Sequence, residues 1–250
     1  VRRIILLFMK NTVIVIPARL AAKRFPNKPL AKIKGLPMIV HVFNRAKESN
    51  IGEVVVATPD NEIFETVKKN GGCAILTQID HQSGSDRVYE VYRKKFMNNA
   101  ELIINLQGDM PNIDPQSISK LEKHMQKNNC DIGTLASILE KNNIINPNVV
   151  KVQVDEDMTI SNFLVAKDFF RIKKDLKNEK IYHQIGIYAF TKDALTKYVK
   201  LSRSKLETER SLEQMRAMEN NMIIKVGLCD SKPLGVDTAE GLKKVAESMK

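Results

Sequence analysis

Residues 13–30, VIVIPARLAAKRFPNKPL, decide the fold. The stretch opens with four consecutive β-branched residues and Pro17, which is typical of a short strand buried on both faces of a sheet. A basic loop follows this strand. Residues 37–49 then carry apolar side chains at helical spacing, and residues 53–58, EVVVAT, form a second short apolar run. This order predicts a βαβ unit with parallel strands.

The alternation of helical and strand patterns continues through the first half of the chain. We expect a helix near 61–70, a strand at 73–77, a helix at about 84–96 and a strand at 101–107. Four strands that alternate with helices favour an α/β fold with a doubly wound, mostly parallel sheet. Asp114 followed by Pro115 marks the start of the next helix, because aspartate caps helix N-termini and proline fits the first helical position.

The pattern changes to consecutive strands after residue 130. Strands are expected at 131–137, 149–155 and 181–190, with a lysine-rich stretch at 171–180. We interpret the region of roughly 132–190 as an inserted β-rich lobe. The end of the chain returns to alternation, with a helix near 207–220, a strand at 223–228 and a final helix from residue 238.

These patterns fit a single domain over residues 9–250. Residues 1–8 contain an apolar run too short for the ~7–15-residue core of a signal peptide. Because Met9 stands just ahead of the first strand, we interpret residues 1–8 as an extension from an alternative start codon. No apolar run approaches the ~20 residues of a membrane span. The three cysteines are too few and too widely spaced for a disulfide framework or a zinc site, which predicts reduced thiols and a cytoplasmic protein.

The positive charge of the chain is concentrated beside the first strand. The net charge is +11, and residues 1–50 contain 11 Lys or Arg against one acidic residue, so the other 200 residues contribute only +1. Nucleic-acid-binding proteins usually spread basic residues along a stripe or a tail. A single basic segment instead favours one compact anion, such as a small molecule that carries phosphate.

The basic loop supplies the first candidate site. It presents Arg19, Lys23, Arg24 and Lys28 directly after the first strand. Arginine offers bidentate donors to phosphate oxygens and lysine offers a point charge, so the loop is suited to a triphosphate. The alternative is an ordinary solvated basic loop, and the glycine pattern of dinucleotide-binding proteins is absent from it.

Two aspartates are candidate ligands of a cation. Asp109, in LQGDMP, follows a buried strand and therefore lies at the carboxyl edge of the sheet, where open α/β sheets bind their ligands. A carboxylate there suits Mg²⁺, although it also suits a turn before proline. Asp237, in GVDTAEGL, precedes the final helix. It has a strong alternative interpretation as a helix N-cap with Glu240 as its capping-box partner.

These segments resemble one family of enzymes in order along nearly the whole chain from Val13. The matching segments are VIVIPARLAAKRFPNKPL, KGLPMIVHVFNRA, VVVATPD, DHQSGSDR, INLQGDMP, NPNVVKV, QIGIYAF, LETERSLEQMRAMEN and GVDT. The chain resembles the bacterial CMP-Kdo synthetases, the 3-deoxy-manno-octulosonate cytidylyltransferases. The resemblance implies a nucleotidyltransferase-type fold, a homodimer paired through the β-rich lobe, and transfer of CMP from CTP to the sugar acid Kdo with release of pyrophosphate, for lipopolysaccharide synthesis.

The resemblance also assigns residues to the nucleotide side. It implies that Asp109 and Asp237 hold Mg²⁺ as the cofactor. The triphosphate loop would act through Arg19, Arg24 and Lys28. Further nucleotide contacts are implied at Ala18, Ser83 and Gln107, where the local alternative for Ser83 is a capping box with Asp86 at the start of a helix.

The acceptor side matches the family less closely. The resemblance places Tyr188, Glu213 and Gln214 in the sugar pocket, although a strand residue and the polar face of a helix explain them equally well. The chain departs from the usual family residues at Met110, Leu164, Val165 and Gln184. Because the departures remove an arginine that would meet the sugar acid, we expect Lys167, Arg171 or His183 to replace it, or the acceptor to differ.

Two other functions remain alternatives. The altered acceptor residues allow a cytidylyltransferase for another ulosonic acid, such as an 8-amino Kdo or a nonulosonic acid. A basic nucleic-acid-binding protein is the non-enzyme alternative, but the concentration of charge near one strand and the lack of a basic-aromatic RNA-binding motif count against it.

Overall fold

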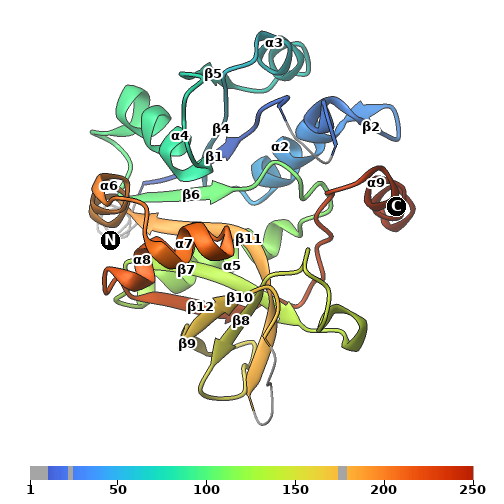
Figure 1. Ribbon diagram of the computed structural model, residues 1–250. Coiled ribbons are helices and arrows are strands. Elements are labelled where there is room, and N and C mark those ends of the chain that lie inside the picture. Colours follow the sequence, from blue (N-terminus) through green and yellow to red (C-terminus); the bar gives the residue numbers. More distant parts are fainter. Residues whose placement is uncertain (1–10, 22–24, 174–178, 250) are drawn as a thin grey trace, which may run out of the picture.

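The computed structural model describes residues 11–21, 25–173 and 179–249. Residues 1–8, interpreted above as an extension, lie outside the described residues. The described chain folds around a ten-stranded mixed sheet in the order β5-β4-β1-β6-β11-β7-β12-β9, with β8 and β10 joined to it through β11 (Figure 1). A separate two-stranded ribbon, β2 (Lys32–Ile33) with β3 (Leu36–Pro37), follows the basic loop.

The first half of the chain forms the parallel part of this sheet. Its strands are β1 (Thr12–Pro17), β4 (Gly52–Thr58), β5 (Ala74–Leu76) and β6 (Leu102–Leu106). Its helices are α2 (Met38–Glu48), α3 (Asn61–Lys69) and α4 (Gly84–Val91), and α4 continues into a π-helical turn, η3 (Tyr92–Phe96). β1 pairs in parallel with both β4 and β6. The predicted doubly wound α/β arrangement is confirmed.

The second half of the chain makes the sheet mixed. Its helices are α5 (Pro115–Lys127), capped by Asp114 as predicted, α6 (Lys192–Lys200), α7 (Lys205–Arg210), α8 (Gln214–Glu219) and α9 (Ala239–Ser248). Its strands are β7 (Ile132–Ile138), β8 (Lys151–Val154), β9 (Phe163–Val165), β10 (Asp168–Phe170), β11 (Lys180–Thr191) and β12 (Ile224–Leu228). β11 runs antiparallel to β6 and β7, whereas β7 and β12 are parallel.

The strands expected at roughly 132–190 are present, but they do not form a lobe apart from the main sheet. β7 and β11 lie in the middle of the strand order, between β6 and β12. β11 is long enough to serve both regions, because its first residues pair with β8 while its last residues pair with β6. The β-rich region is therefore an extension of the main sheet, and its role in dimerisation stays a prediction.

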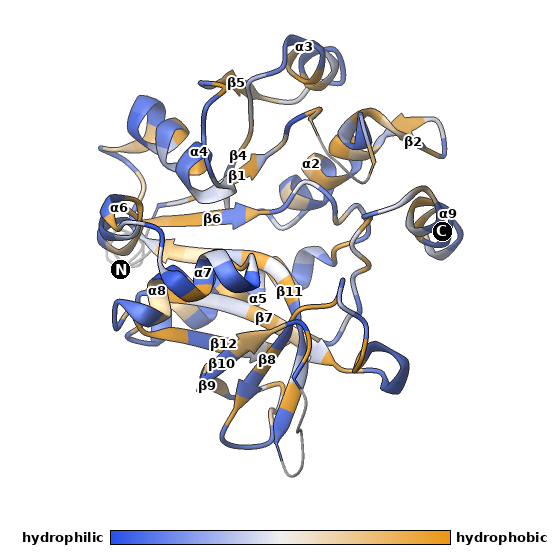
Figure 2. Cartoon of the chain, in the orientation of Figure 1, coloured by the Kyte–Doolittle hydropathy of each residue, from blue (hydrophilic) through white to orange (hydrophobic). Residues whose placement is uncertain are grey.

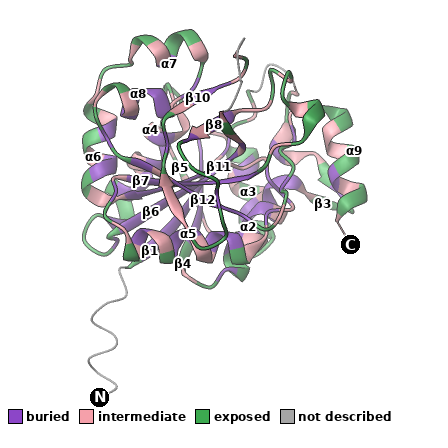
Figure 3. Ribbon diagram, turned by 90° about the horizontal axis from the view of Figure 1, so that it is seen from below, coloured by how far each residue is buried: buried purple, intermediate pink, exposed green. Residues whose placement is uncertain are grey.

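Alternating side chains of β1 show how the sheet is buried on both faces. Val13 and Val15 belong to an apolar cluster with residues of α4 and α6, whereas Ile14 and Ile16 belong to a second cluster with residues of α2 and α5. Figure 2 shows apolar colour along the central strands, and Figure 3 shows buried strands inside helices with exposed outer faces. Burial on both faces is what the continuous β-branched run predicts.

The predicted helix near 207–220 is wrong as a single element. The chain forms two short helices, α7 and α8, because Ser211 adopts a left-handed backbone conformation (φ 52°) that ends α7. The break lets the next residues turn toward α4, where the Glu213 carboxylate accepts a hydrogen bond from the Gly84 N–H at 3.1 Å. A tertiary contact has overridden the local helical pattern.

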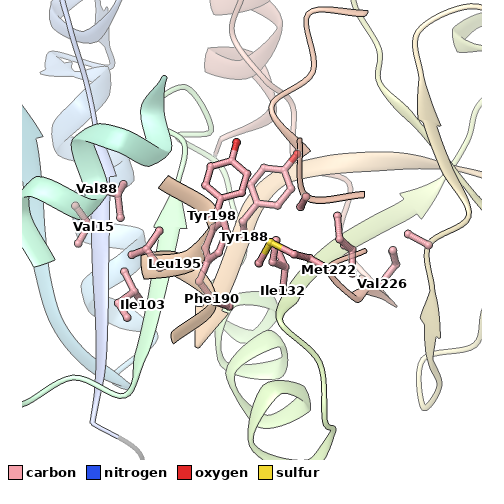
Figure 4. Close-up of a cluster of buried hydrophobic side chains, with 14 of the residues drawn as sticks. Val15, Val88, Ile103, Ile132, Tyr188, Phe190, Leu195, Tyr198, Met222 and Val226 are labelled. Carbon is pink, nitrogen blue, oxygen red and sulfur yellow. The ribbon is translucent and has the colours of Figure 1, made fainter. Parts of the chain in front are cut away.

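A buried ion pair joins α7 to α8. The Arg216 guanidinium donates to both oxygens of Glu207, at 2.8 and 2.6 Å, and their side chains are 3% and 2% exposed. Burial opposes ionisation of Glu207, yet the hydrogen bonds from Arg216 hold its pKa below the ordinary value. The guanidinium also lies over the ring of Tyr198, 4.7 Å from its centroid, at the edge of the apolar cluster drawn in Figure 4.

We predict that Arg216→Met lowers the free energy of unfolding by about 3–5 kcal/mol, because it leaves the buried Glu207 carboxylate without its buried cation and with only the half-exposed Arg203 and the Ser204 N–H as partners. The measurement is urea denaturation at neutral pH. Arg203→Met is the matched control, since Arg203 contacts the same carboxylate at 3.3 Å but is 48% exposed. Its expected cost is below ~1 kcal/mol. Equal losses in the two variants would contradict the importance of the buried pair.

Candidate functional site

The carboxyl ends of β1 and β6 open into a cleft of about 1030 Å³. Its walls come from the loop after β1, the loop after β6 and the N-terminus of α4. Six residues predicted on the nucleotide side line it together, namely Ala18, Arg19, Lys28, Ser83, Gln107 and Asp109. Lys23 and Arg24, the remaining members of the predicted basic loop, lie outside the described residues.

Asp109 and Asp237 converge on one cation, the ammonium group of Lys28. The Lys28 Nζ atom lies 2.8 Å from an oxygen of Asp109 and 3.6 Å from an oxygen of Asp237. The backbone fixes this meeting, because the Val236 N–H donates to the carbonyl oxygen of Asp109 at 2.9 Å. Residues separated by more than a hundred positions in the sequence are thus held side by side at the sheet edge.

Gly108 explains how the loop after β6 approaches β1 so closely. A Cβ atom at this position would lie 3.2 Å from both the Pro17 carbonyl oxygen and the Ile39 side chain. A larger residue would push Asp109 away from the basic loop. The glycine of the QGD segment therefore has a packing role that serves the position of the aspartate.

The interpretation of Asp237 as a helix N-cap is wrong. The N-cap of α9 is Thr238, whose hydroxyl accepts a hydrogen bond from the Gly241 N–H at 3.1 Å. Glu240 pairs with Lys244 at 2.7 Å instead of completing a capping box. Because Thr238 takes the capping role, the carboxylate of Asp237 pairs with Lys28 instead.

The N-terminus of α4 forms one wall of the cleft. Ser83 makes the capping box with Asp86 that its local sequence predicts, so its helix-capping role is confirmed. The carboxylate of Glu213 accepts from the N–H of Gly84 and from the hydroxyl of Ser85 at 2.9 Å. A negative charge at this position is stabilised by the partial positive charge of a helix N-terminus.

Sequence reasoning missed two charged residues in the cleft, Arg87 and Asp60. Arg87 is buried and donates to the carbonyl oxygen of Gln78 at 2.9 Å, and its pKa is lowered by burial and by the nearby charge of Arg19. Asp60 accepts a hydrogen bond from the Leu20 N–H at 2.8 Å and so holds the basic loop. The signal for Asp60 was present, since it follows β4 at the same carboxyl edge.

A second cavity of about 370 Å³ adjoins the cleft. Lys28, Gln107, Asp109 and Glu213 line both spaces, so the two cavities meet at the cluster of Lys28 and its carboxylates. The four residues predicted on the sugar side all line the second cavity, namely Tyr188, Glu213, Gln214 and His183. These residues lie around one cavity, and their roles in binding the sugar stay predictions.

Gln214 and Tyr188 bring buried polar groups to the second cavity. Gln214 is 6% exposed, and its side-chain Nε2 has no hydrogen-bond partner among the residues that the structure describes. Burial, with the nearby charge of Glu213, raises the pKa of Tyr188, so its hydroxyl keeps its proton at neutral pH. An unpartnered buried donor is costly, which suggests that Gln214 awaits a polar ligand.

Of the three expected replacements for the missing arginine, Arg171 and His183 line the second cavity and Lys167 does not. Lys167 pairs at 2.7 Å with Asp155 and is half exposed. Burial and the nearby charge of Lys151 lower the pKa of His183, which leaves its ring neutral at pH 7. Arg171 is therefore the permanent cation of the cavity among the three.

Of the four residues at which the chain departs from the usual family residues, two line the second cavity and two line neither cavity. Met110 and Gln184 line the second cavity. Leu164 and Val165 lie on β9, which pairs with β12, and neither lines either of the two cavities in the described chain. The side chain of Gln184 donates to the hydroxyl of Thr134 at 3.2 Å, so it is held within the sheet.

Comparisons with known proteins agree with this geometry. Residues 13–224 match the family model described as cytidylyltransferase. The chain is 45% identical over 236 residues to a 3-deoxy-manno-octulosonate cytidylyltransferase of Sinorhizobium medicae (strain WSM419) and 42% identical to one of Brucella ovis, with 94% of each chain covered. A solved CMP:2-keto-3-deoxy-manno-octonic acid synthetase complexed with CTP superposes with a TM-score of 0.85 at 36% identity, covering 96% of this chain and 98% of that one.

The chain belongs to the 3-deoxy-manno-octulosonate cytidylyltransferase family. The predicted family resemblance and the nucleotidyltransferase-type fold are thereby confirmed. A likeness at 13% identity to the 4-diphosphocytidyl-2C-methyl-D-erythritol synthase of Anaerococcus prevotii, with a TM-score of 0.63, shows the shared fold alone. Within the described residues, no helix has the length and apolar character needed to cross a membrane.

We predict that Thr238→Ala lowers the free energy of unfolding by about 1 kcal/mol, the usual cost of losing an N-cap. Asp237→Ala should change it much less, because the Asp237 side chain is one-third exposed and does not cap α9. Thermal denaturation of both variants makes the comparison. A loss in Asp237→Ala as large as that in Thr238→Ala would restore the capping interpretation of Asp237.

Proposed function

We propose that this protein transfers CMP from CTP to Kdo, giving CMP-Kdo and pyrophosphate for lipopolysaccharide synthesis. The observation that supports this best is the cluster of Lys28, Asp109 and Asp237 at the point where the two cavities meet. Transfer of a nucleotidyl group requires a nucleotide and an acceptor to reach the same phosphorus atom. Two adjoining cavities that share a charged wall provide such a place.

The large cleft is suited to the nucleotide. Arg19, Lys28 and Arg87 bring positive charge to it, and the N-terminus of α4 faces it. These groups would neutralise the triphosphate and hold the α-phosphorus in line with the acceptor hydroxyl. Positioning and charge stabilisation of this kind account for most of the catalysis in phosphoryl transfer.

We propose Mg²⁺ as the cofactor, held by Asp109 and Asp237. Two carboxylates that already converge on one ammonium group have the hard oxygen donors that Mg²⁺ prefers. A Mg²⁺ ion at this place would complete its coordination with oxygens of phosphate and water. When bound, the ion would neutralise negative charge on the phosphates.

The small cavity is suited to a sugar acid. Arg171 offers a guanidinium to its carboxylate, and Tyr188 and Gln214 offer hydrogen-bond donors to its hydroxyl groups. Gln184 stands in the wall of this cavity in place of the usual family histidine. That departure favours, as a second candidate, the same reaction on another ulosonic acid such as an 8-amino Kdo or a nonulosonic acid.

We also propose that the protein acts as a cytoplasmic homodimer paired through its β-rich region. Support comes from large apolar side chains that are exposed between residues 138 and 172. They are Ile138, Ile144, Ile145, Ile160, Val165 and Ile172. Exposed large apolar side chains that gather on one surface are typical of a site that another protein covers, and these six come from one stretch of the chain.

The function is tested by pyrophosphate release with CTP, UTP, ATP and GTP, each paired with Kdo, its 8-amino analogue and a nonulosonic acid. We predict clear preference for CTP with Kdo and loss of turnover in excess EDTA, because the acceptor and nucleotide are both anionic. Asp109→Asn and Asp237→Asn should each lower turnover by about a hundredfold. Equal rates with all four nucleotides, or full activity in EDTA, would contradict the proposal.

We predict that Arg171→Ala raises the Michaelis constant for the sugar acid by about one to two orders of magnitude, the scale of a charge-assisted hydrogen bond. The constant for CTP should change little, since Arg171 lines only the small cavity. Lys167→Ala is the control and should behave like the wild type. If both variants bind the sugar acid normally, Arg171 does not meet its carboxylate.

A further inference from the structure

Lys151, on β8, is a buried cation that the proposed chemistry has not yet used. It is 1% exposed, among the most buried large side chains of the described structure. Its ammonium group donates to two backbone carbonyl oxygens, those of Asn146 at 2.7 Å and Arg171 at 2.5 Å. Within the described residues, no carboxylate forms an ion pair with it.

Arg171, like Lys151, donates to backbone carbonyl oxygens and not to a described carboxylate. Its guanidinium donates to the carbonyl oxygens of Pro147 and Asn148, at 3.0 and 3.4 Å, and it too has no ion pair with a described carboxylate. The segment 146–148 is therefore held by the side chains of both cations. Asn148 and Arg171 line the small cavity, so this arrangement forms part of its wall.

Burying a charge without an ion of opposite sign is unfavourable, and carbonyl dipoles offset only part of the cost. Burial and the charge of Arg171 accordingly lower the pKa of Lys151. A neutral amide side chain could donate hydrogen bonds to the same carbonyl oxygens and hold segment 146–148 with a smaller desolvation cost. The retained charge points to an anion that arrives from outside the chain.

The charged residues at the small cavity differ in their ionic partners. Of its three acidic residues, Asp109 and Glu213 also line the large cleft, whereas Asp237 lines the small cavity alone and pairs with Lys28 beside Asp109. Arg171 and the neutral His183 line the small cavity and not the large cleft. Lys151 lies near enough to His183 to lower its pKa, and Arg171 in turn lowers the pKa of Lys151. Asp109 and Asp237 are therefore paired with Lys28, whereas the two cations Arg171 and Lys151 have no ion pair with a described carboxylate.

We propose that Lys151 is a specificity-determining residue of the acceptor cavity, whose counter-ion is the carboxylate of the bound sugar acid. It acts in two ways. It positions Arg171 and segment 146–148 through their carbonyl oxygens, and its charge makes the cavity selective for an acid over a neutral sugar. Lys151 does not line the cavity, so it is a positioning residue. This inference rests on the proposed function and concerns only acceptor binding.

The test compares Lys151→Met, which keeps the length of the side chain, and Lys151→Gln, which keeps a donor for the carbonyl oxygens. The matched control is Lys180→Met, since Lys180 lies on the neighbouring strand β11 but is exposed and paired with Asp157. For each protein, we would measure the Michaelis constants for Kdo and CTP, the inhibition constant of the carboxamide of Kdo, and the melting temperature.

We expect both Lys151 variants to raise the Michaelis constant for Kdo by about tenfold, the effect of losing one favourable charge interaction. The constant for CTP and the inhibition constant of the carboxamide should stay within about twofold of wild type. Lys151→Gln should keep the melting temperature, because it removes the buried charge and keeps a donor for the two carbonyl oxygens, whereas Lys151→Met loses those hydrogen bonds. A merely structural lysine would instead weaken the acid and the amide equally.

Other outcomes would overturn the inference. These are an unchanged constant for Kdo, equal losses for the acid and the amide, or failure of both Lys151 variants to fold while Lys180→Met folds. Failure of the proposed function itself looks different, because the wild-type protein would then release no pyrophosphate from CTP with Kdo.

Discussion

The structure depends on one electrostatic constraint, the meeting of Lys28 with the carboxylates of Asp109 and Asp237. Like charges on the two aspartates would repel one another without the ammonium group between them. The fold supplies the three groups from the loop after β1, the loop after β6 and the segment before α9, and it fixes them with backbone hydrogen bonds. Because both cavities border this cluster, its position determines where a nucleotide and an acceptor meet.

A second set of contacts ties the acceptor side to the nucleotide side. Glu213 lines both cavities while its carboxylate holds the N-terminus of α4. Arg216, three residues later, pairs with Glu207 and lies 3.8 Å from Asp86 of the α4 capping box. The hydroxyl of Tyr198 donates to the carbonyl oxygen of Glu213 at 2.9 Å. A shift of α8 would therefore displace the N-terminus of α4, which forms one wall of the nucleotide cleft.

Sequence reasoning performed best where a local pattern has one physical explanation. The β-branched run at β1, the Asp-Pro start of α5 and the capping box at Ser83 were each predictable from neighbouring residues. It failed where a distant group decides the local conformation. The helix pattern at 207–220 gave no sign of the break at Ser211, and the Asp237 carboxylate has its partner in Lys28, far away in the sequence.

The sequence by itself determined the α/β alternation, the family and the residue types of the site, because strand burial, helix caps and motif order are properties of short segments. Only the tertiary structure decided that Asp237 pairs with Lys28. It also decided that Arg171 lines the acceptor cavity and Lys167 does not, and that Lys151 is buried beside Arg171. The physical reason is that charge pairing and burial depend on distances between segments. Those distances are set by the packing of β8, β11 and the sheet edge as a whole.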